Sequence, residues 1–286
     1  MAKNLKDIVF TSALRTPIGK FKGLWRKFQA YELGKIVILN ILQQTKIEPK
    51  FIDEVIMGQV LTGGTGQNPA RQAAIAGGIP VEKTAYLINQ VCGSGLRSIA
   101  AGYQSILLND AKIVIAGGQE SMTNSKEEMM LKDGLIDAYN NYHMGITAEN
   151  VAEKWNISRK DQDNFAISSQ LKTQDAIKNK RFKEEIIQGK ILQDEHPRAD
   201  ITIESLFKLK SVFKDNGTVT AGNSSGINDG AAAVILMTRE EADKRNLKSL
   251  AKIVSWATCG VDPTLMGLGP IPASKKALKK AGWEVK

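Results

Sequence analysis

Five short apolar runs are the feature that most constrains the fold of this chain. Each run is almost continuously apolar rather than alternating, which is the pattern of strands covered on both faces. The runs occupy residues 8–14, 54–61, 86–91, 112–116 and 231–237. Patterns that predict helices lie between the first four runs, at residues 33–44, 68–76 and 95–108. This order predicts a layered α/β sheet.

The stretch of residues 121–226 is more polar than its surroundings and predicts mostly helix. Its clearest helix follows Ser158, which stands at capping-box spacing from Asp161, and extends to about residue 181. We interpret this stretch as an insertion that interrupts the sheet domain before the last apolar run.

Near its end the chain starts a new unit. Residues 251–257 predict a strand, a loop with Gly267, Gly269 and Pro270 follows, and then comes a helix with the basic run 275–280. These elements are the opening of a further α/β unit, and roughly 38 residues cannot bury a core alone. We therefore expect either an appendage or a fragment of a longer chain.

The composition is that of an ordinary globular protein, with 42% apolar and 24% charged residues. It excludes a disordered tail, a collagen-like fibre and a disulfide scaffold. The net charge of +9 favours polyanionic partners, either nucleic acid or a phosphate-bearing cofactor. Two cysteines, a start without an apolar leader and the lack of a membrane-length apolar run predict a soluble, cytoplasmic protein.

Cys92 directly follows the third apolar run and precedes two glycines and a predicted helix (NQVCGSGL, residues 89–96). Glycines let a backbone approach a ligand closely. The N-terminus of a helix stabilises negative charge, and its free N–H groups can hold a developing oxyanion. The window predicts a nucleophilic cysteine on a strand–turn–helix elbow, with a buried structural cysteine as the alternative.

A second window, residues 219–231 (VTAGNSSGINDGA), places small and polar residues just before the last apolar run. Small residues suit a narrow channel lined by backbone. A simple tight turn explains the same composition, so this window alone leaves both interpretations open.

Together with these two windows, five further motifs carry a resemblance that spans the whole chain. They are residues 15–19 (RTPIG), 66–72 (GQNPARQ), 116–122 (AGGQESM), 143–150 (HMGITAEN) and 266–270 (MGLGP). In this order they resemble the thiolase family, of the acetyl-CoA acetyltransferase type. Met144 beside His143 is more similar to the biosynthetic, short-chain branch than to the long-chain degradative one.

The resemblance implies a layered α/β/α/β/α fold built from two similar halves. Residues 1–120 and 227–248 would form the complete first half, and residues 121–226 would be an inserted loop domain that binds coenzyme A. Residues 249–286 would be the start of a second, C-terminally truncated half.

The resemblance also implies an enzyme that condenses two acetyl-CoA molecules to acetoacetyl-CoA and coenzyme A, or catalyses the reverse thiolysis. Cys92 would carry the acyl group as a thioester, with no metal and no cofactor beyond the coenzyme A thioesters themselves. The acyl and pantetheine pocket would be lined by Leu135, His143 and Met144. Arg198 would lie at the adenine and phosphate end, and the pantetheine arm would be flanked by Phe213, Ala221 and Ser225.

Taken without the resemblance, several of these residues have simpler explanations. Leu135 and Phe213 suit a hydrophobic core, Arg198 suits a solvated surface, and His143 suits a buried imidazole with a satisfied hydrogen bond.

The sequence departs from the family in its catalytic apparatus. Thiolases also use a histidine in a Gly-His-Pro loop, a second cysteine in a Gly-rich loop and an Asn-Glu-Ala-Phe segment, all further along the family's chain than this sequence reaches. His143 and His196 are the two histidines, and Cys259 lacks Gly-rich surroundings, so we interpret it as a packing residue. Because a general base typically contributes about 10²–10⁴-fold, we expect this chain alone to be inactive in condensation.

A second departure lies at residues 123–132, where the family usually has a longer excursion that joins dimers into tetramers. The short, charged segment here argues for a homodimer and against a tetramer.

Two functional hypotheses follow, and two others are excluded. The chain is either the N-terminal part of an active acetyl-CoA acetyltransferase, or a truncated pseudoenzyme that binds acyl-CoA or becomes acylated without condensing it. Its basic residues are scattered without a nucleic-acid motif, and residues 63–66 lack the third glycine of a dinucleotide site. We expect neither nucleic acid nor a membrane as a partner.

Overall fold

The structure is a computed structural model that describes residues 6–187, 189 and 193–285. The chain divides into two units, each of which is described by itself. The first comprises Met1–Lys126, Lys183–Glu195 and Ile227–Ile253, and the second comprises Glu127–Phe182, His196–Gly226 and Val254–Lys286.

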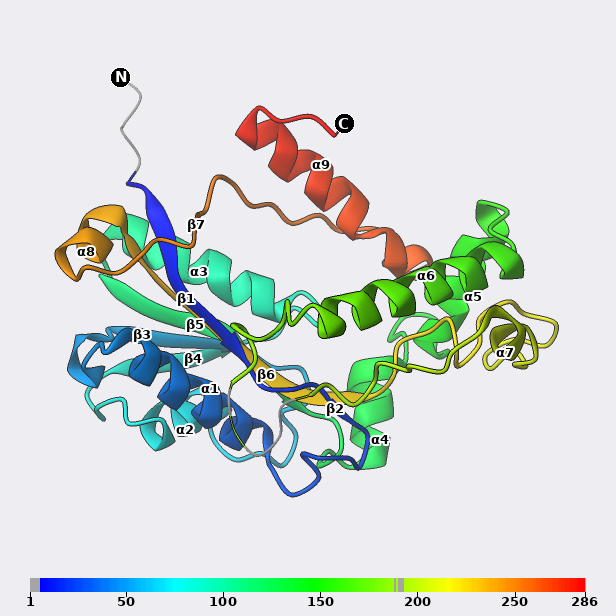
Figure 1. Ribbon diagram of the computed structural model, residues 1–286, viewed down its shortest axis with the longest axis horizontal. Helices are drawn as coiled ribbons and strands as arrows, with labels where there is room; N and C mark the ends of the chain where they lie inside the picture. The colour runs from blue at the N-terminus through cyan, green and yellow to red at the C-terminus, as the bar shows by residue number, and fades with distance from the viewer. Residues whose placement is uncertain (1–5, 188, 190–192, 286) are drawn as a thin grey trace. The chain divides into compact units, whose positions relative to one another are not determined.

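A mixed sheet forms the centre of the first unit, with the strand order β4-β3-β5-β6-β1-β7 and the short β2 paired to β6 (Figure 1). Its strands are β1 (Ile8–Arg15), β2 (Gly19–Lys20), β3 (Glu54–Gly58), β4 (Thr84–Ile88), β5 (Ile113–Ser121), β6 (Asn228–Thr238) and β7 (Ala251–Lys252). β3 runs parallel to β4 and β5, whereas β6 runs antiparallel to β5 and β1. The carboxyl ends of β3, β4 and β5 therefore meet at one edge of the sheet.

Double burial explains the continuous apolar runs. Alternate residues of β5 enter two separate cores: Ile113 and Ile115 pack with α1 (Ala30–Thr45), whereas Val114 packs with α3 (Ser94–Leu108). Successive side chains of a strand point to opposite faces, so a strand that is covered twice is apolar throughout. The prediction of a covered α/β sheet is confirmed.

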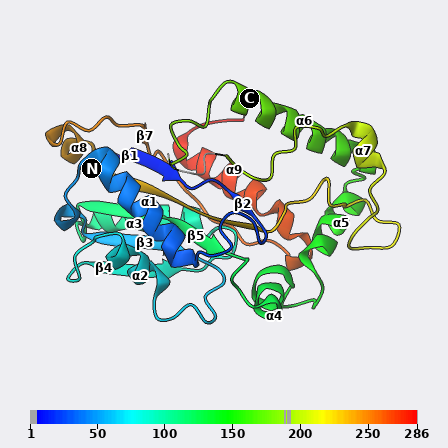
Figure 2. The same cartoon turned by 60° about the horizontal axis from the view of Figure 1, so that its bottom comes forward.

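Helices cover both faces of this sheet. α1 and α2 (Pro69–Ala76) lie on one face and α3 on the other, and α1 comes in front of the strands when the molecule is turned (Figures 1 and 2). The predicted start of α2 is confirmed, because the Asn68 side chain accepts the Arg71 N–H at 3.1 Å and Pro69 takes the first helical position. The first unit also contains η1 (Pro49–Phe51) and α8 (Arg239–Lys244).

The five strands differ in their bounds from the apolar runs that predict them. β4 (Thr84–Ile88) ends before residue 91, where its run ends, and β6 (Asn228–Thr238) extends beyond its run at both ends. β3 ends at Gly58 rather than at residue 61, because the N–H groups of Val60 and Leu61 donate to the Glu120 carboxylate instead of to a neighbouring strand. β5 is longer than its run, because antiparallel pairing with β6 continues to Ser121.

The second unit contains helices and irregular backbone. Its helices are α4 (Glu127–Met129), η2 (Met130–Leu135), α5 (Met144–Lys154), α6 (Arg159–Lys178), α7 (Ile203–Phe207), η3 (Pro263–Leu268) and α9 (Pro270–Ala281). The predicted capping box of α6 is confirmed by hydrogen bonds between Ser158 and Asp161. The prediction of mostly helix is wrong, since the described residues of 179–202 and 208–227 contain no helix and are held by side-chain hydrogen bonds to backbone instead.

Near the end of the chain, two predictions are corrected. The strand expected at residues 251–257 is limited to Ala251–Lys252, which pairs with β1 at the edge of the sheet. The loop that holds Gly267 is the 3₁₀ helix η3, which begins where the Asp262 side chain accepts the Thr264 N–H at 2.9 Å.

The start of α3 lies directly against the sheet. A Cβ atom at Gly58 would stand 2.5 Å from the carbonyl carbon of Ser94, so only glycine fits between β3 and the helix. On the neighbouring strand, the Ser98 hydroxyl donates to the Gly117 carbonyl at 2.6 Å. The N-terminal part of α3 is thus fixed to β3 and β5 by contact with their backbones.

We predict that Gly58→Ala lowers the free energy of unfolding by about 1–3 kcal/mol, because the added methyl group forces α3 away from β3. Urea denaturation measures the change. Gly95→Ala is the matched control: its Cβ would meet no atom within 4 Å, so this variant should be no less stable than the wild type. Equal stability of the two variants would refute the packing argument.

Candidate active site

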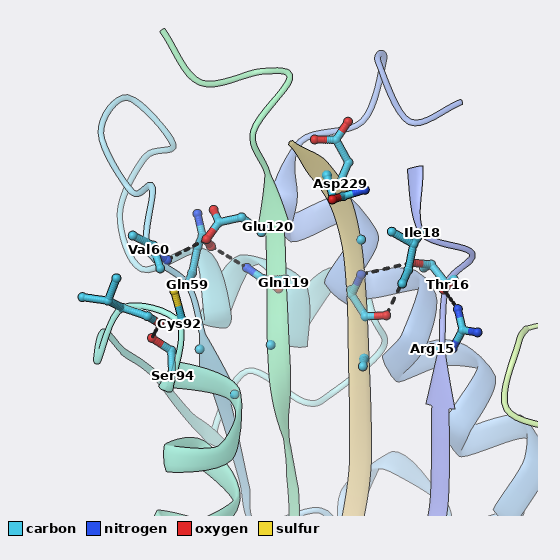
Figure 3. A pocket seen from close by; sticks show the side chains of 18 residues that line it. Arg15, Thr16, Ile18, Gln59, Val60, Cys92, Ser94, Gln119, Glu120 and Asp229 are labelled. Carbon is cyan, nitrogen blue, oxygen red and sulfur yellow. Dashed lines mark hydrogen bonds between the residues drawn. The ribbon is translucent and has the colours of Figure 1, made fainter. Parts of the chain in front are cut away.

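A cavity of about 390 Å³ opens at the sheet edge where the carboxyl ends of the three parallel strands meet. Such edges are where open α/β sheets bind their ligands. All of its lining residues belong to the first unit. The lining side chains with polar or reactive groups include Gln59, Cys92, Ser94, Gln119, Glu120 and Asp229 (Figure 3).

Cys92 stands on a strained turn between β4 and α3. Its thiol is free and exposed. The preceding residue, Val91, has a φ of +48°, a left-handed conformation that is unfavourable for a β-branched side chain. The predicted strand–turn–helix elbow lies here, and the exposed thiol does not fit the alternative of a buried structural cysteine.

Two neighbouring side chains hold this turn. The Asn89 carboxamide oxygen accepts the Val91 N–H at 2.9 Å, two residues along the chain. The Ser94 hydroxyl accepts the Gln90 N–H at 2.9 Å and donates to the Val91 carbonyl at 2.6 Å. The backbone N–H of Cys92 has no acceptor among the described residues. It is therefore free to donate to a negatively charged oxygen beside the thiol.

Glu120, at the end of β5, is the carboxylate whose pKa is most affected by this environment. Burial raises the pKa of Glu120 to about 7, assisted by the negative charge of Asp229 and opposed by two backbone hydrogen bonds. These bonds come from the N–H groups of Val60 at 2.8 Å and Leu61 at 3.3 Å. Glu120 thus ties the end of β5 to the loop after β3.

Asp229 and Arg15 complete the far side of the cavity. Asp229 is 1% exposed and accepts the Thr123 N–H at 2.9 Å. The Arg15 guanidinium forms a two-pronged ion pair with Asp194, at 2.7 and 3.0 Å, and another bond to Glu185 at 2.8 Å. Both residues secure loops around the entrance.

Of the predicted pocket residues, the structure brings His143 and Phe213 together. Their rings stack with centroids 4.6 Å apart. His143 also caps α5, because its Nδ1 atom accepts the Gly145 N–H at 3.0 Å. Burial lowers the pKa of His143, which agrees with a neutral ring that accepts at Nδ1. Met144 is the first residue of α5, and the half-buried Leu135 is the last residue of η2.

Ala221 and Ser225 lie on an exposed turn that buried carboxylates hold in place. Glu149 is 4% exposed and accepts the N–H groups of Thr218 and Val219 at 2.9 and 2.7 Å. Asp163 is fully buried and accepts from the Asn223 carboxamide at 3.0 Å.

Arg198 is exposed, and its backbone N–H donates to the Gln170 side chain at 3.0 Å. Among the predicted site residues, Cys92 belongs to the first unit and the other seven belong to the second. Sequence reasoning missed Glu120 and Asp229 at the cavity and Glu149 beside the turn. Their signal was present, since each lies within a quoted motif or window, but the partners that give each its role are distant in sequence.

No helix among the described residues is both long and apolar enough to cross a membrane. Nor do three or more His, Cys, Asp or Glu side chains of this part of the chain gather in a way that could hold a metal ion.

Comparison with known proteins places the chain in a family. The family model "Thiolase, N-terminal domain" matches residues 8–129 and 123–240, and "Thiolase, C-terminal domain" matches residues 247–286. The acetyl-CoA acetyltransferase of Rhizobium meliloti (strain 1021) is 50% identical over 98% of this chain and 77% of its own length. That of Paracoccus denitrificans is 50% identical over 97% of this chain and 77% of its own length.

The crystal structure of the Bacillus anthracis acetyl-CoA acetyltransferase matches with a TM-score of 0.92 and 36% sequence identity, covering 98% of this chain and 78% of that one. The chain belongs to the thiolase family. The predicted family and fold class are thereby confirmed, and the chain spans about three quarters of the length of these relatives.

The raised pKa of Glu120 predicts a pH-dependent stability. Between about pH 4.5 and 7 the folded chain keeps the Glu120 proton while the unfolded chain releases it, so this group lowers the free energy of unfolding as the pH rises through that window. We predict that Glu120→Gln removes this decline, which amounts to at most about 3 kcal/mol. Urea denaturation at several pH values measures it.

The matched control is Asp53→Asn at the opposite end of the sheet. Asp53 also accepts two consecutive backbone N–H groups, from Lys112 at 2.8 Å and Ile113 at 3.1 Å. This variant should keep the decline toward pH 7. A decline that persists unchanged in Glu120→Gln would assign it to another group.

Proposed function

We propose that this chain acts as a thiolase on acetyl-CoA, with Cys92 as the nucleophile. The observation that carries the proposal is the exposed Cys92 thiol at the mouth of a 390 Å³ cavity, beside a Cys92 N–H that has no acceptor among the described residues. The names of the relatives, which are acetyl-CoA acetyltransferases, support acetyl-CoA as the substrate.

In the first step the Cys92 thiolate attacks the carbonyl carbon of acetyl-CoA. The new carbon–sulfur bond forms as the bond to coenzyme A breaks, and coenzyme A leaves as a thiolate that takes up a proton. The Cys92 N–H and the start of α3 stabilise the negative charge that develops on the carbonyl oxygen.

In the second step another acetyl-CoA loses a proton from its α-carbon, which balances the proton that the coenzyme A thiolate took up in the first step. The resulting carbanion attacks the acetyl-Cys92 thioester. A carbon–carbon bond forms, acetoacetyl-CoA is released and the Cys92 thiolate is regenerated. Thiolysis is the reverse. Both steps balance without a metal or a redox cofactor, and we propose that coenzyme A thioesters are the only small molecules required.

The second unit supplies the proposed contacts to coenzyme A. The acyl and pantetheine parts would contact Leu135, His143, Met144, Phe213, Ala221 and Ser225. The exposed guanidinium of Arg198 suits the phosphates of coenzyme A. The neutral His143 ring, stacked on Phe213, offers the flat apolar surface that a pantetheine chain needs.

A homodimer is the proposed assembly. Among the strands that the structure describes, β4 ends the sheet and pairs on one side only, with β3. An unpaired edge invites the same edge of a second chain.

One observation favours a second candidate, an acylatable protein that does not condense acetyl-CoA. No histidine of the described residues lines the Cys92 cavity, so no imidazole there can take up a proton from the thiol or from an α-carbon. Acylation of Cys92 is common to both candidates, and formation of acetoacetyl-CoA separates them.

We predict that incubation with acetyl-CoA adds one acetyl group to the wild-type chain and none to Cys92→Ser, as read by intact-mass spectrometry. Cys259→Ser is the control and should be acetylated like the wild type. Acetoacetyl-CoA measured in the same mixture decides between the two candidates. An acetyl group found on Cys259, or none on a wild-type chain whose Cys92 remains alkylatable, would contradict the proposal.

A further inference from the structure

A continuous path of hydrogen bonds joins the half-buried Glu120 to the strained turn before Cys92. Glu120 accepts the Val60 N–H at 2.8 Å, and the carbonyl of Val60 accepts the Asn89 carboxamide N–H at 3.4 Å. The oxygen of the same carboxamide accepts the Val91 N–H at 2.9 Å. The path crosses three segments that are distant in sequence: the end of β5, the loop after β3 and the turn after β4.

The turn at Val91 needs such support. Valine in a left-handed conformation is disfavoured by its branched Cβ, and that conformation persists where the surroundings over-determine it. Here the N–H of Val91 is held by Asn89 and its carbonyl is held by Ser94. Because Cys92 is the next residue, the conformation of Val91 sets the direction in which the Cys92 thiol and N–H point.

We propose that Asn89 and Glu120 are positioning residues, which act through Val60 to keep Val91 in its left-handed conformation and so aim Cys92 at the cavity. The inference rests on the proposed function to the extent that Cys92 is the nucleophile. Neither side chain forms or breaks a bond in the reaction. Figure 3 shows Glu120, Val60 and Cys92 gathered at the same side of the cavity.

The charge on Glu120 contributes to this support. A carboxylate can accept from both Val60 and Leu61, whereas a protonated carboxyl group has one strong acceptor left. The ionisable groups that line the cavity with Glu120 are Asp229 on β6, Arg15 on β1 and Cys92 itself. Protonation of Glu120 near pH 7 should therefore weaken its hydrogen bonds to the loop after β3. Through Asn89, this change should also loosen the turn at Val91.

The first test measures how fast iodoacetamide alkylates Cys92, with the alkylation of Cys259 in the same sample as an internal reference for intact folding. Asn89→Ala should lower the Cys92 rate about two- to tenfold, the range expected for one lost hydrogen bond. Asn89→Ser, whose hydroxyl can accept the same N–H two residues on, should retain most of the rate. An unchanged or raised rate in Asn89→Ala would overturn the proposal.

The second test is a double-mutant cycle, which distinguishes a positioning role of Asn89 from a general contribution to stability. Glycine reaches the left-handed conformation without steric cost, so Val91→Gly removes the need for the Asn89 hydrogen bond that holds this conformation. Asn89→Ala should then lower the Cys92 rate much less in the Val91→Gly chain than in the wild type. Equal losses in both chains would show that Asn89 acts by another route.

The third test uses the pH profile of the same alkylation. The wild-type rate should show a step near pH 7 in addition to the titration of the thiol, and Glu120→Gln should lack that step. Asp53→Asn, the matched carboxylate at the far end of the sheet, should keep it. A step that survives in Glu120→Gln would exclude Glu120 from the path.

These readouts separate the inference from the proposed function, because alkylation requires no acetyl-CoA. If the variants behave as expected while acetyl-CoA fails to acetylate the wild-type Cys92, the positioning path stands and the thiolase proposal fails. If acetylation occurs and the variants alkylate like the wild type, the thiolase proposal stands and the positioning path fails.

Discussion

Double burial of β5 is the constraint on which the candidate site depends. Ile113 and Ile115 pack toward α1 and Val114 packs toward α3, so neither face of the strand contacts water. A shift of one residue would move each side chain into the opposite layer, where the available space differs. The polar end of the strand is fixed by the same packing. Glu120 consequently lies where the carboxyl ends of β3 and β4 meet.

The apolar runs locate the strands because double burial marks every residue of a strand. They do not reveal strand direction, since the antiparallel position of β6 between β5 and β1 depends on pairing between distant segments. The apolar pattern also does not show where a side chain replaces a strand as hydrogen-bond partner. β3 ends early because the Glu120 carboxylate accepts the N–H groups of Val60 and Leu61. Helix starts are predicted well at Asn68 and Ser158, because a cap is encoded within a few residues.

The residues of the candidate site differ in the same way, since some are marked by a local pattern and others depend on distant segments. Cys92 can be found from sequence, because a cysteine followed by glycines at a strand end is a distinctive local pattern. Glu120, Asp229 and Glu149 lie within recognisable motifs, but their roles cannot be predicted from sequence, because each depends on backbone groups far away along the chain. The strain at Val91 is equally hidden, since valine is an ordinary strand residue and its left-handed conformation arises only from the surrounding hydrogen bonds.

His143 shows how several structural contacts can restrict the replacement of one side chain. Its imidazole caps α5, stacks on Phe213 and is held in one tautomer by the Gly145 N–H. A replacement would alter the helix start, the ring stack and any ligand contact together. The side chains of Met144 and Leu135 are apolar, so they do not cap a helix as His143 does. A substitution at either of these two positions should therefore disturb the local structure less than a substitution at position 143.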